Sequence, residues 1–258
     1  TGEQLEEQRK ALQEIEEKRP TSRSSYFGVV DLAGFPKDRF YLYKAHWMPD
    51  EPMVHILPHW NFPDRIGKVT PVFVYSSGDE VELFLNGRSL GKKSKQPYEY
   101  RFRWDSVYYE SGELKAIAYK DGKKWAEKHI RTTGKPERLK LTPDKKVLKS
   151  DGEDLIFVRV SVLDAEGNEV PTAEPLITSS VSGPGMIAAT DNGDPTCLIP
   201  FHEPKRPAFN GLYLAIVKAR RGSEGTLHLC VEADGLGKKE NDIRIQNEGL
   251  EKRYLLTD

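Results

Sequence analysis

EVELFLNGRSLG, residues 80–91, contains the clearest structural signal in the chain. Val81, Leu83 and Leu85 alternate with other residues, as in a strand that buries one face. The Asn86-Gly87 pair that follows favours a two-residue hairpin turn, because both residues tolerate positive φ. The stretch therefore predicts a β-hairpin that joins strands over 80–85 and 89–93.

The same period of two continues on both sides of this hairpin. Segments with the pattern are 72–74, 98–104, 114–119 and 124–131, and Asp121-Gly122 supplies a second hairpin turn between the last two. About seven short strands over roughly eighty residues are typical of an immunoglobulin-like β-sandwich. We assign this domain to residues 51–134.

The strand pattern restarts after a linker at 132–136. Six segments alternate or are apolar throughout: 138–142, 155–163, 177–181, 186–190, 212–219 and 226–233. They predict a second immunoglobulin-like β-sandwich over 135–235, so the fold class is mainly β with two tandem sandwiches. Residues 191–211 are expected to form a long irregular loop. Residues 236–258 are expected to be a charged tail, in which 243–245 adds one edge strand.

The first fifty residues are expected to be mostly helical. Residues 1–21 have a capping-box start and a thin apolar stripe, and they predict an exposed helix or an insertion. Residues 26–30 are compatible with a short buried strand or a tight loop. A helix is predicted from about 37 to 47, with Phe40, Tyr43 and Trp47 on one face, and we expect that face to pack in the core. One helix and one short strand cannot make a domain, so this face needs a partner.

Composition limits the classes of function. The chain has 258 residues, a net charge of −1 and a mean hydropathy of −0.62, so we expect no nucleic-acid partner and no membrane span. Cys197 and Cys230 are expected to remain unpaired. The chain starts at Thr1 without an initiator Met, and we expect it to be an excised piece of a longer protein.

The sequence contains none of the common catalytic or cofactor motifs. It has no Gly-x-Ser-x-Gly elbow, no phosphate-binding Gly loop and no His-Glu-x-x-His zinc motif. Pro58 between His55 and His59 argues against a helical metal pair, and residues 191–194 lack the rest of a calcium loop. We therefore expect no metal and no cofactor.

Two polar and aromatic loops remain as candidate substrate-binding sites. Residues 57–63, LPHWNFP, place two aromatic rings between two prolines, where the backbone is stiff. Aromatic faces can stack on sugar rings, and Asn, Asp and His side chains can bind hydroxyls. The alternative is that Trp60 and Phe62 only seal a domain junction. The candidate residues are His59, Trp60, Asn61, Asp191, Asn192, Asp194, His202 and Asn210.

Four stretches in order resemble glycoside hydrolase family 2, of the β-galactosidase type found in Bacteroides. Residues 24–43 resemble the last strand-to-helix passage of the catalytic barrel in that family. Residues 57–63 with Gly67-Lys68, and then 80–91, resemble the domain after the barrel. Residues 181–185, 191–195 and 209–211 resemble the next domain. The resemblance implies that 22–50 is the end of a TIM barrel, and that 1–21 departs from the family as an insertion.

The resemblance also implies what this chain lacks. In the family, the acid/base Glu and the nucleophilic Glu lie upstream, so no catalytic residue carries over and the fragment itself is expected to be inactive. Family glucuronidases hold the sugar acid with Asn-x-Lys where this chain has Ser25-Tyr26-Phe27, which favours neutral galactosides. The longer protein is expected to be a retaining glycosidase that acts on oligosaccharides in the periplasm or outside the cell.

Two other functions stay open from the sequence. One is a pair of carbohydrate-binding modules, which would bind oligosaccharides through residues such as Trp60. The other is a structural or adhesion protein with tandem immunoglobulin-like domains, which would bind a larger protein partner instead.

Overall fold

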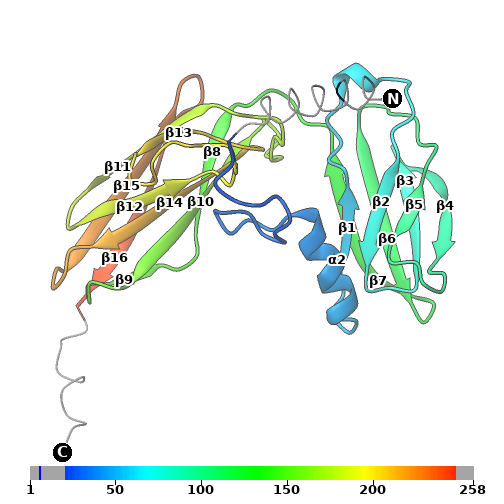
Figure 1. Ribbon diagram of the computed structural model, residues 1–258, viewed down its shortest axis with the longest axis horizontal. Coiled ribbons are helices and arrows are strands. Elements are labelled where there is room, and N and C mark those ends of the chain that lie inside the picture. Colours follow the sequence, from blue (N-terminus) through cyan, green and yellow to red (C-terminus); the bar gives the residue numbers. More distant parts are fainter. Residues whose placement is uncertain (1–5, 7–20, 248–258) are drawn as a thin grey trace, which may run out of the picture.

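Two β-sandwiches lie side by side, and a single helix with the loop before it lies between them (Figure 1). The computed structural model describes residue 6 and residues 21–247. The helix expected near the N-terminus, over 1–21, therefore lies outside the described residues apart from residues 6 and 21. The mainly β prediction is confirmed.

The first sandwich contains two antiparallel sheets. One has the order β1-β2-β5 and the other β4-β3-β6-β7. Asn86 and Gly87 have φ angles of 50° and 79°, so the hairpin between β3 and β4 has the expected turn. The strands are β1 (Val54–Leu57), β2 (Val72–Ser76), β3 (Glu80–Leu85), β4 (Arg88–Ser94), β5 (Phe102–Trp104), β6 (Glu113–Lys120) and β7 (Lys123–Arg131), with a short 3-10 turn at Pro63–Arg65.

The alternating residues of these strands form the core of the first sandwich. Val81, Leu83 and Leu85 are almost completely buried, and they pack with Trp60 and Tyr109 in one cluster. The core therefore contains an aromatic pair from loops as well as the apolar faces of strands.

The second sandwich also contains two sheets, in the orders β12-β14-β10-β8 and β13-β11-β15-β16-β9. Its core is a separate cluster of apolar residues, so each sandwich has its own hydrophobic centre. The strands are β8 (Arg138–Pro143), β9 (Val147–Lys149), β10 (Leu155–Leu163), β11 (Leu176–Ser182), β12 (Gly185–Asp191), β13 (Lys205–Pro207), β14 (Leu212–Ala219), β15 (Gly225–Ala233) and β16 (Gly237–Gln246).

Strand β16 differs from the expectation of an edge strand in a charged tail. It pairs along its whole length with β15 and, in parallel, with β9 on its other side. Ile243 and Ile245 are 1% and 3% exposed, while the charged residues of the strand point outward. The second sandwich therefore continues to Gln246. Two apolar side chains, Ile243 and Ile245, are the part of β16 that is buried in its core.

Helix α2 (Asp38–Trp47) packs on the outer face of the sheet β1-β2-β5. Ala45 contacts a small cluster that contains Met53 and Tyr75, and Tyr41 stacks on His55 with ring centroids 3.9 Å apart. A hydrogen bond also joins His55 Nε2 to the carboxylate of Asp38 at 2.7 Å. The helix is thus fixed to the first sandwich by one face.

The expectation that the aromatic face of α2 packs in the core is wrong. Tyr43 and Trp47 stack on each other at 4.8 Å, and they are 36% and 75% exposed. Phe40 is half-buried. The face that was expected to need a partner is turned away from both sandwich cores.

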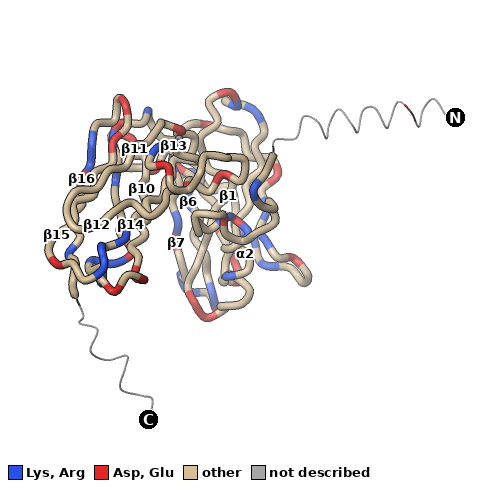
Figure 2. The backbone as a smooth tube through the Cα atoms, turned by 60° about the vertical axis from the view of Figure 1, so that its left-hand side comes forward, with Lys and Arg blue, Asp and Glu red and all other residues tan. Residues whose placement is uncertain are grey.

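The segment before α2 is a loop. Its only pairing is an isolated bridge between Val30 and Pro36, and Tyr26 and Phe27 are 59% and 79% exposed. Of the two alternatives for 26–30, the structure has a loop and not a buried strand, and the helix predicted from about 37 to 47 is present as α2. Acidic and basic residues are interspersed over both sandwiches (Figure 2). Among the described residues, no helix is both long and apolar enough to cross a membrane.

Candidate functional site

Trp60 lies in the core of the first sandwich. Its ring is 1% exposed, its Nε1–H donates a hydrogen bond to the carbonyl of Glu110 at 2.9 Å, and its centroid is 4.8 Å from that of Tyr109. A buried ring cannot stack on a sugar. The expectation that Trp60 binds substrate is therefore corrected, and the alternative, that it seals the junction, describes its position.

Asn61 connects the junction to the linker between the sandwiches. Its Nδ2 donates to Thr133 Oγ1 at 2.5 Å, and its Oδ1 accepts from the backbone N–H of Thr133 at 2.8 Å. Thr132 donates to the carbonyl of Trp60 at 2.8 Å beside this pair. The Asn61 amide is therefore occupied by the linker and has a structural role in this arrangement.

His59 is the one junction candidate with an exposed side chain. It stacks on Phe62 at 4.5 Å, and its Nδ1 accepts the backbone N–H of Asn61 at 3.2 Å. Although one side of the ring is open to solvent, desolvation by the surrounding protein lowers the pKa of His59, and Asp38 acts in the opposite sense. The neutral ring is thus favoured near neutral pH.

A cavity of about 540 Å³ lies between the two sandwiches next to His59. The first sandwich contributes His59, Trp60 and Arg131, and the second contributes Arg159 and Glu169. Arg159 donates from Nη2 to both carboxylate oxygens of Glu169 at 2.7 Å. Polar side chains from both domains therefore line the cavity. Two of the eight predicted residues, His59 and Trp60, lie along it, and of these only His59 is exposed.

The loop after β12 is closed by its own side chains. Asp191 Oδ1 accepts the backbone N–H groups of Asn192 and Gly193, at 2.7 and 3.1 Å. Asn192 donates from Nδ2 to the carbonyl of Pro207 at 3.0 Å. Asp194 Oδ1 accepts from both the N–H and the hydroxyl of Thr196. These are turn-forming contacts, and within the described part of the chain no cluster of His, Cys, Asp and Glu could hold a metal.

His202 and Asn210 lie apart from these turns. The side chain of His202 is 79% exposed and lies 3.5 Å from the carboxylate of Glu203. Asn210 is exposed at the turn between β13 and β14, with a φ of 52°. The eight predicted residues are therefore not brought into one pocket, since those of the 191–211 loop do not line the cavity beside His59.

Arg206, in β13, holds the loop that precedes it, and it was not among the predicted site residues. It is fully buried, and its guanidinium donates to Thr190 Oγ1, to the sulfur of Cys197 and to the carbonyls of Ile199 and Pro200 at 2.9–3.4 Å. Among the described residues it has no carboxylate partner. These four hydrogen bonds fix the course of the loop, and a lone Arg in a polar segment gives no sequence signal of that role.

The passage before α2 is held against this loop. Arg23 donates from its backbone N–H to the carbonyl of Pro195 at 2.8 Å and from Nη2 to that of Ile199 at 2.8 Å, and its guanidinium lies 4.5 Å from the centre of the Phe201 ring. Asp31 lies so close to Gly193 that a Cβ there would be 2.1 Å from its carboxylate. The second sandwich therefore contacts the passage, while the first holds α2.

Asp31 is partly buried in this contact. Desolvation raises its pKa, hydrogen bonds from the backbone of Phe35 and Ala33 lower it, and the nearby carboxylate of Asp191 raises it further. Its Oδ1 accepts the N–H of Phe35 at 2.9 Å. Asp31 and Asp191 both accept hydrogen bonds from backbone N–H groups, so their carboxylates stabilise the turns in which they lie.

Sequence comparison finds matches for both sandwiches. A profile described as glycoside hydrolase family 2 C-terminal domain 5 matches residues 139–242, and a domain of unknown function matches residues 67–126. A β-galactosidase of Bacteroides ovatus is 45% identical over 89% of this chain, and a putative β-glucuronidase of Formosa agariphila is 38% identical over 65% of it. This chain spans 26% and 16% of the length of those two proteins.

Solved structures agree with these sequence matches. A β-glycosidase from Bacteroides vulgatus is 33% identical with a TM-score of 0.82, over 86% of this chain and 28% of its own length. A glycosyl hydrolase family 2 member from Bacteroides cellulosilyticus has a TM-score of 0.79 at 28% identity, over 85% of this chain and 31% of its own length. With both sandwiches matched in order, the chain belongs to the C-terminal region of glycoside hydrolase family 2.

Proposed function

We propose that this chain is the non-catalytic C-terminal part of a retaining β-glycosidase that acts on oligosaccharides. The observation that carries the proposal is the way in which residues 22–47 are held. The first sandwich fixes one face of α2, the second sandwich fixes the preceding passage, and Tyr43 and Trp47 are left open. Such an arrangement suits a segment whose remaining face is covered by a catalytic barrel.

The exposed aromatic rings give this proposal its energetic reason. Burying a large apolar side chain contributes about 1.5–3 kcal/mol, so a stacked Tyr-Trp pair on a surface is a favourable docking point for another domain. Glycosidases of the retaining class need two carboxyls roughly 5 Å apart. The neighbouring carboxylates Asp31 and Asp191 instead accept backbone hydrogen bonds in turns, so the catalytic pair is proposed to lie elsewhere in the longer protein.

A β-galactoside is the proposed substrate class. It is supported by the identity of 45% with a protein named β-galactosidase. A β-glucuronide is the second candidate, because a relative named β-glucuronidase is 36% identical over 65% of this chain. We place the longer protein in the periplasm or outside the cell, an expectation from the family resemblance that cell fractionation can test.

Hydrolysis assays test the proposal directly. The 258-residue chain and the longer protein that contains it are incubated separately with nitrophenyl β-galactoside and nitrophenyl β-glucuronide. The chain is expected to match a buffer blank, and the longer protein is expected to release nitrophenol from the galactoside faster than from the glucuronide. Turnover that follows the 258-residue chain through two different chromatography steps would contradict the proposal.

A further inference from the structure

Two arginines lie over one aromatic ring on the outer face of the first sandwich. The guanidinium carbons of Arg101 and Arg103 are 4.5 and 5.8 Å from the centre of the Phe73 ring. Arg103 is directly opposite Phe73 in the pairing of β5 with β2. The two cations are therefore held on the same face of the sheet, beside helix α2.

The charges at this point are only partly balanced. Arg103 forms an ion pair with Asp105 at 2.8 Å. Arg101 has no carboxylate partner among the described residues, and it instead lies 5.3 Å from the ring centre of Tyr100. Burial raises the pKa of Tyr75, while a hydrogen bond with Arg101 opposes that effect. The cavity beside the ring is lined by the cations Lys93, Arg101 and Arg103 and by the carboxylates Glu99 and Asp105, so the positive charges exceed the negative ones.

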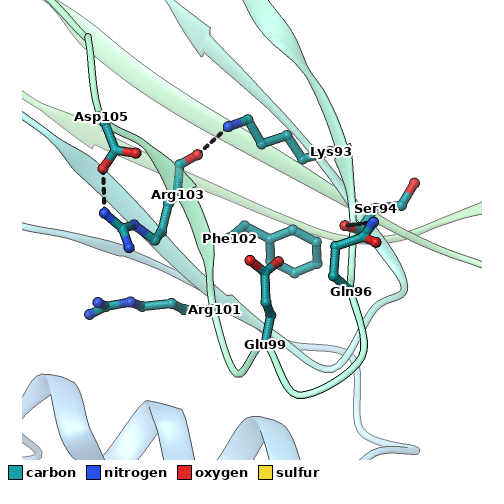
Figure 3. A pocket seen from close by; sticks show the side chains of 8 residues that line it. All are labelled: Lys93, Ser94, Gln96, Glu99, Arg101, Phe102, Arg103 and Asp105. Atoms are coloured by element: carbon teal, nitrogen blue, oxygen red, sulfur yellow. Dashed lines mark hydrogen bonds and ion pairs between the residues drawn. The ribbon is translucent and has the colours of Figure 1, made fainter.

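A cavity of about 480 Å³ opens next to these arginines, within the size range of small-ligand sites (Figure 3). Lys93 reaches over it to the carbonyl of Arg103, while Gln96 and Glu99 line its loop side. These side chains offer both donors and acceptors, as sugar hydroxyls require.

The loop that borders the cavity carries two exposed tyrosines. Tyr100 is 52% exposed, and Tyr98, with a φ of 64°, is completely exposed. The backbone carbonyl of Tyr100 lies 3.3 Å from Nε2 of His46, so α2 supports the loop. A tyrosine has an apolar face and a polar tip, and two such rings beside a cationic pair suit a sugar that bears an acid group.

We propose that Arg101, Arg103 and Tyr100 form a binding site for an acidic oligosaccharide. The carboxylate of a uronic acid, or the sulfate group of a sulfated sugar, would accept hydrogen bonds from the two guanidinium groups, whose paired N–H donors can bind two oxygens of one anion. The sugar ring would lie against Tyr100, and its hydroxyls would reach Gln96 and Glu99. The choice of a sugar over a simple anion rests on the proposed function, whereas the site itself requires no catalytic activity.

Titration calorimetry on the 258-residue chain tests the site with three probes: trigalacturonic acid, a sulfated galactose trisaccharide and neutral galactotriose. Saturable binding is expected for at least one acidic probe, and which one binds distinguishes carboxylate from sulfate. Arg101→Gln is expected to weaken that binding about tenfold or more, because a charge-assisted hydrogen bond is lost. Tyr100→Ala is expected to weaken it as well, and higher salt should reduce it.

Matched variants keep the test specific. Arg221→Gln and Tyr26→Ala replace an exposed arginine on the second sandwich and an exposed tyrosine in the passage, and both should leave binding unchanged. Arg101→Lys, which keeps the charge but loses the planar fork, should give an intermediate affinity. No binding of either acidic probe at millimolar concentration, equal binding of galactotriose, or an Arg101→Gln variant that is folded and binds normally would overturn the proposal. None of these results would contradict the proposed glycosidase activity of the longer protein, which the hydrolysis assays test separately.

Discussion

The side-chain amide of Asn61 and the backbone and hydroxyl of Thr133 form a reciprocal pair of hydrogen bonds, at 2.5 and 2.8 Å. The pair joins the entrance of the first sandwich to its exit, 72 residues later. The linker therefore leaves the first sandwich at a fixed point, and this contact contributes to the arrangement of the two domains.

Replacing Asn61 tests this contact. Asn61→Ala leaves the N–H of Thr133 without its partner, which should lower the free energy of unfolding of the first sandwich by about 1–3 kcal/mol. Urea unfolding followed by tryptophan fluorescence measures the change, because Trp60, Trp104 and Trp125 all belong to this domain. In a double-mutant cycle with Thr133→Ala the two losses should not add; additive losses would mean that the residues act independently.

Arg206 should control the stability of the loop after β12. Arg206→Met removes the hydrogen bonds from the guanidinium to Thr190 Oγ1 and to the carbonyls of Ile199 and Pro200. Arg23 still donates to the Ile199 carbonyl, and the N–H of Glu203 still donates to that of Pro200. We expect a loss of about 2–4 kcal/mol in the second sandwich and faster proteolysis between residues 191 and 205. Arg221→Met, at an exposed arginine of the same domain, is the control and should behave like the native chain. Equal proteolysis of the two variants would show that Arg206 does not hold the loop.

Asp31 should make the folded chain less stable as the pH rises, whereas an acid in a salt bridge makes it more stable. Its pKa is raised in the folded chain above the ordinary 3.8, mainly by desolvation, with Asp191 raising it and Lys37 lowering it. The folded state then binds more protons than the unfolded state, so stability falls as the pH rises from 3.8 through the raised pKa. Asp31→Asn keeps an acceptor for Phe35 and should remove this fall.

The measurement is thermal unfolding of both proteins across that pH range. The stability of Asp31→Asn relative to the native chain should increase with pH and then level off above the raised pKa of Asp31. Asp234→Asn serves as a control for charge alone. A stability difference that stays constant across the range would contradict the raised pKa.

Substitution on the aromatic face of α2 should have a different effect on the stability of the 258-residue chain and of the longer protein. Trp47→Ser should change the stability of the 258-residue chain by less than about 0.5 kcal/mol, as for other exposed positions. In the longer protein the same change should cost about 1.5–3 kcal/mol, because the proposed catalytic barrel would bury the ring. Tyr108→Ser, at an exposed ring of the first sandwich, should be neutral in both, and differential scanning calorimetry compares them. A Trp47→Ser variant that is also neutral in the longer protein would mean that no domain covers this face.

The sequence predicted the strands well where one face is buried. The pattern of Val81, Leu83 and Leu85 identified β3, and Asn86-Gly87 identified its turn, because a period of two and a positive φ are local properties. Strands β1, β9 and β13 were missed, since they have three or four residues and are fixed by their neighbours in the sheet. Strand β16 was underestimated because its charged residues outnumber its two buried isoleucines.

The candidate site was harder to predict for a different reason. Residue type indicated that Trp60 and Asn61 could bind a sugar, but their partners Glu110 and Thr133 are 50 and 72 residues away. Only the fold shows that these groups are already occupied. In the same way, nothing local in the sequence places Arg101 and Arg103 over Phe73, because that contact depends on the pairing of β5 with β2.

Peptide mapping of a trapped glycosyl-enzyme intermediate shows whether the catalytic nucleophile lies outside residues 1–258. A retaining glycosidase forms a covalent bond between the sugar and a carboxylate, and a 2-deoxy-2-fluorogalactosyl fluoride can hold that intermediate in the longer protein. Mass spectrometry of its peptides should locate the label on a glutamate upstream of Thr1, with residues 1–258 unlabelled. A label on any carboxylate within residues 1–258 would contradict the account.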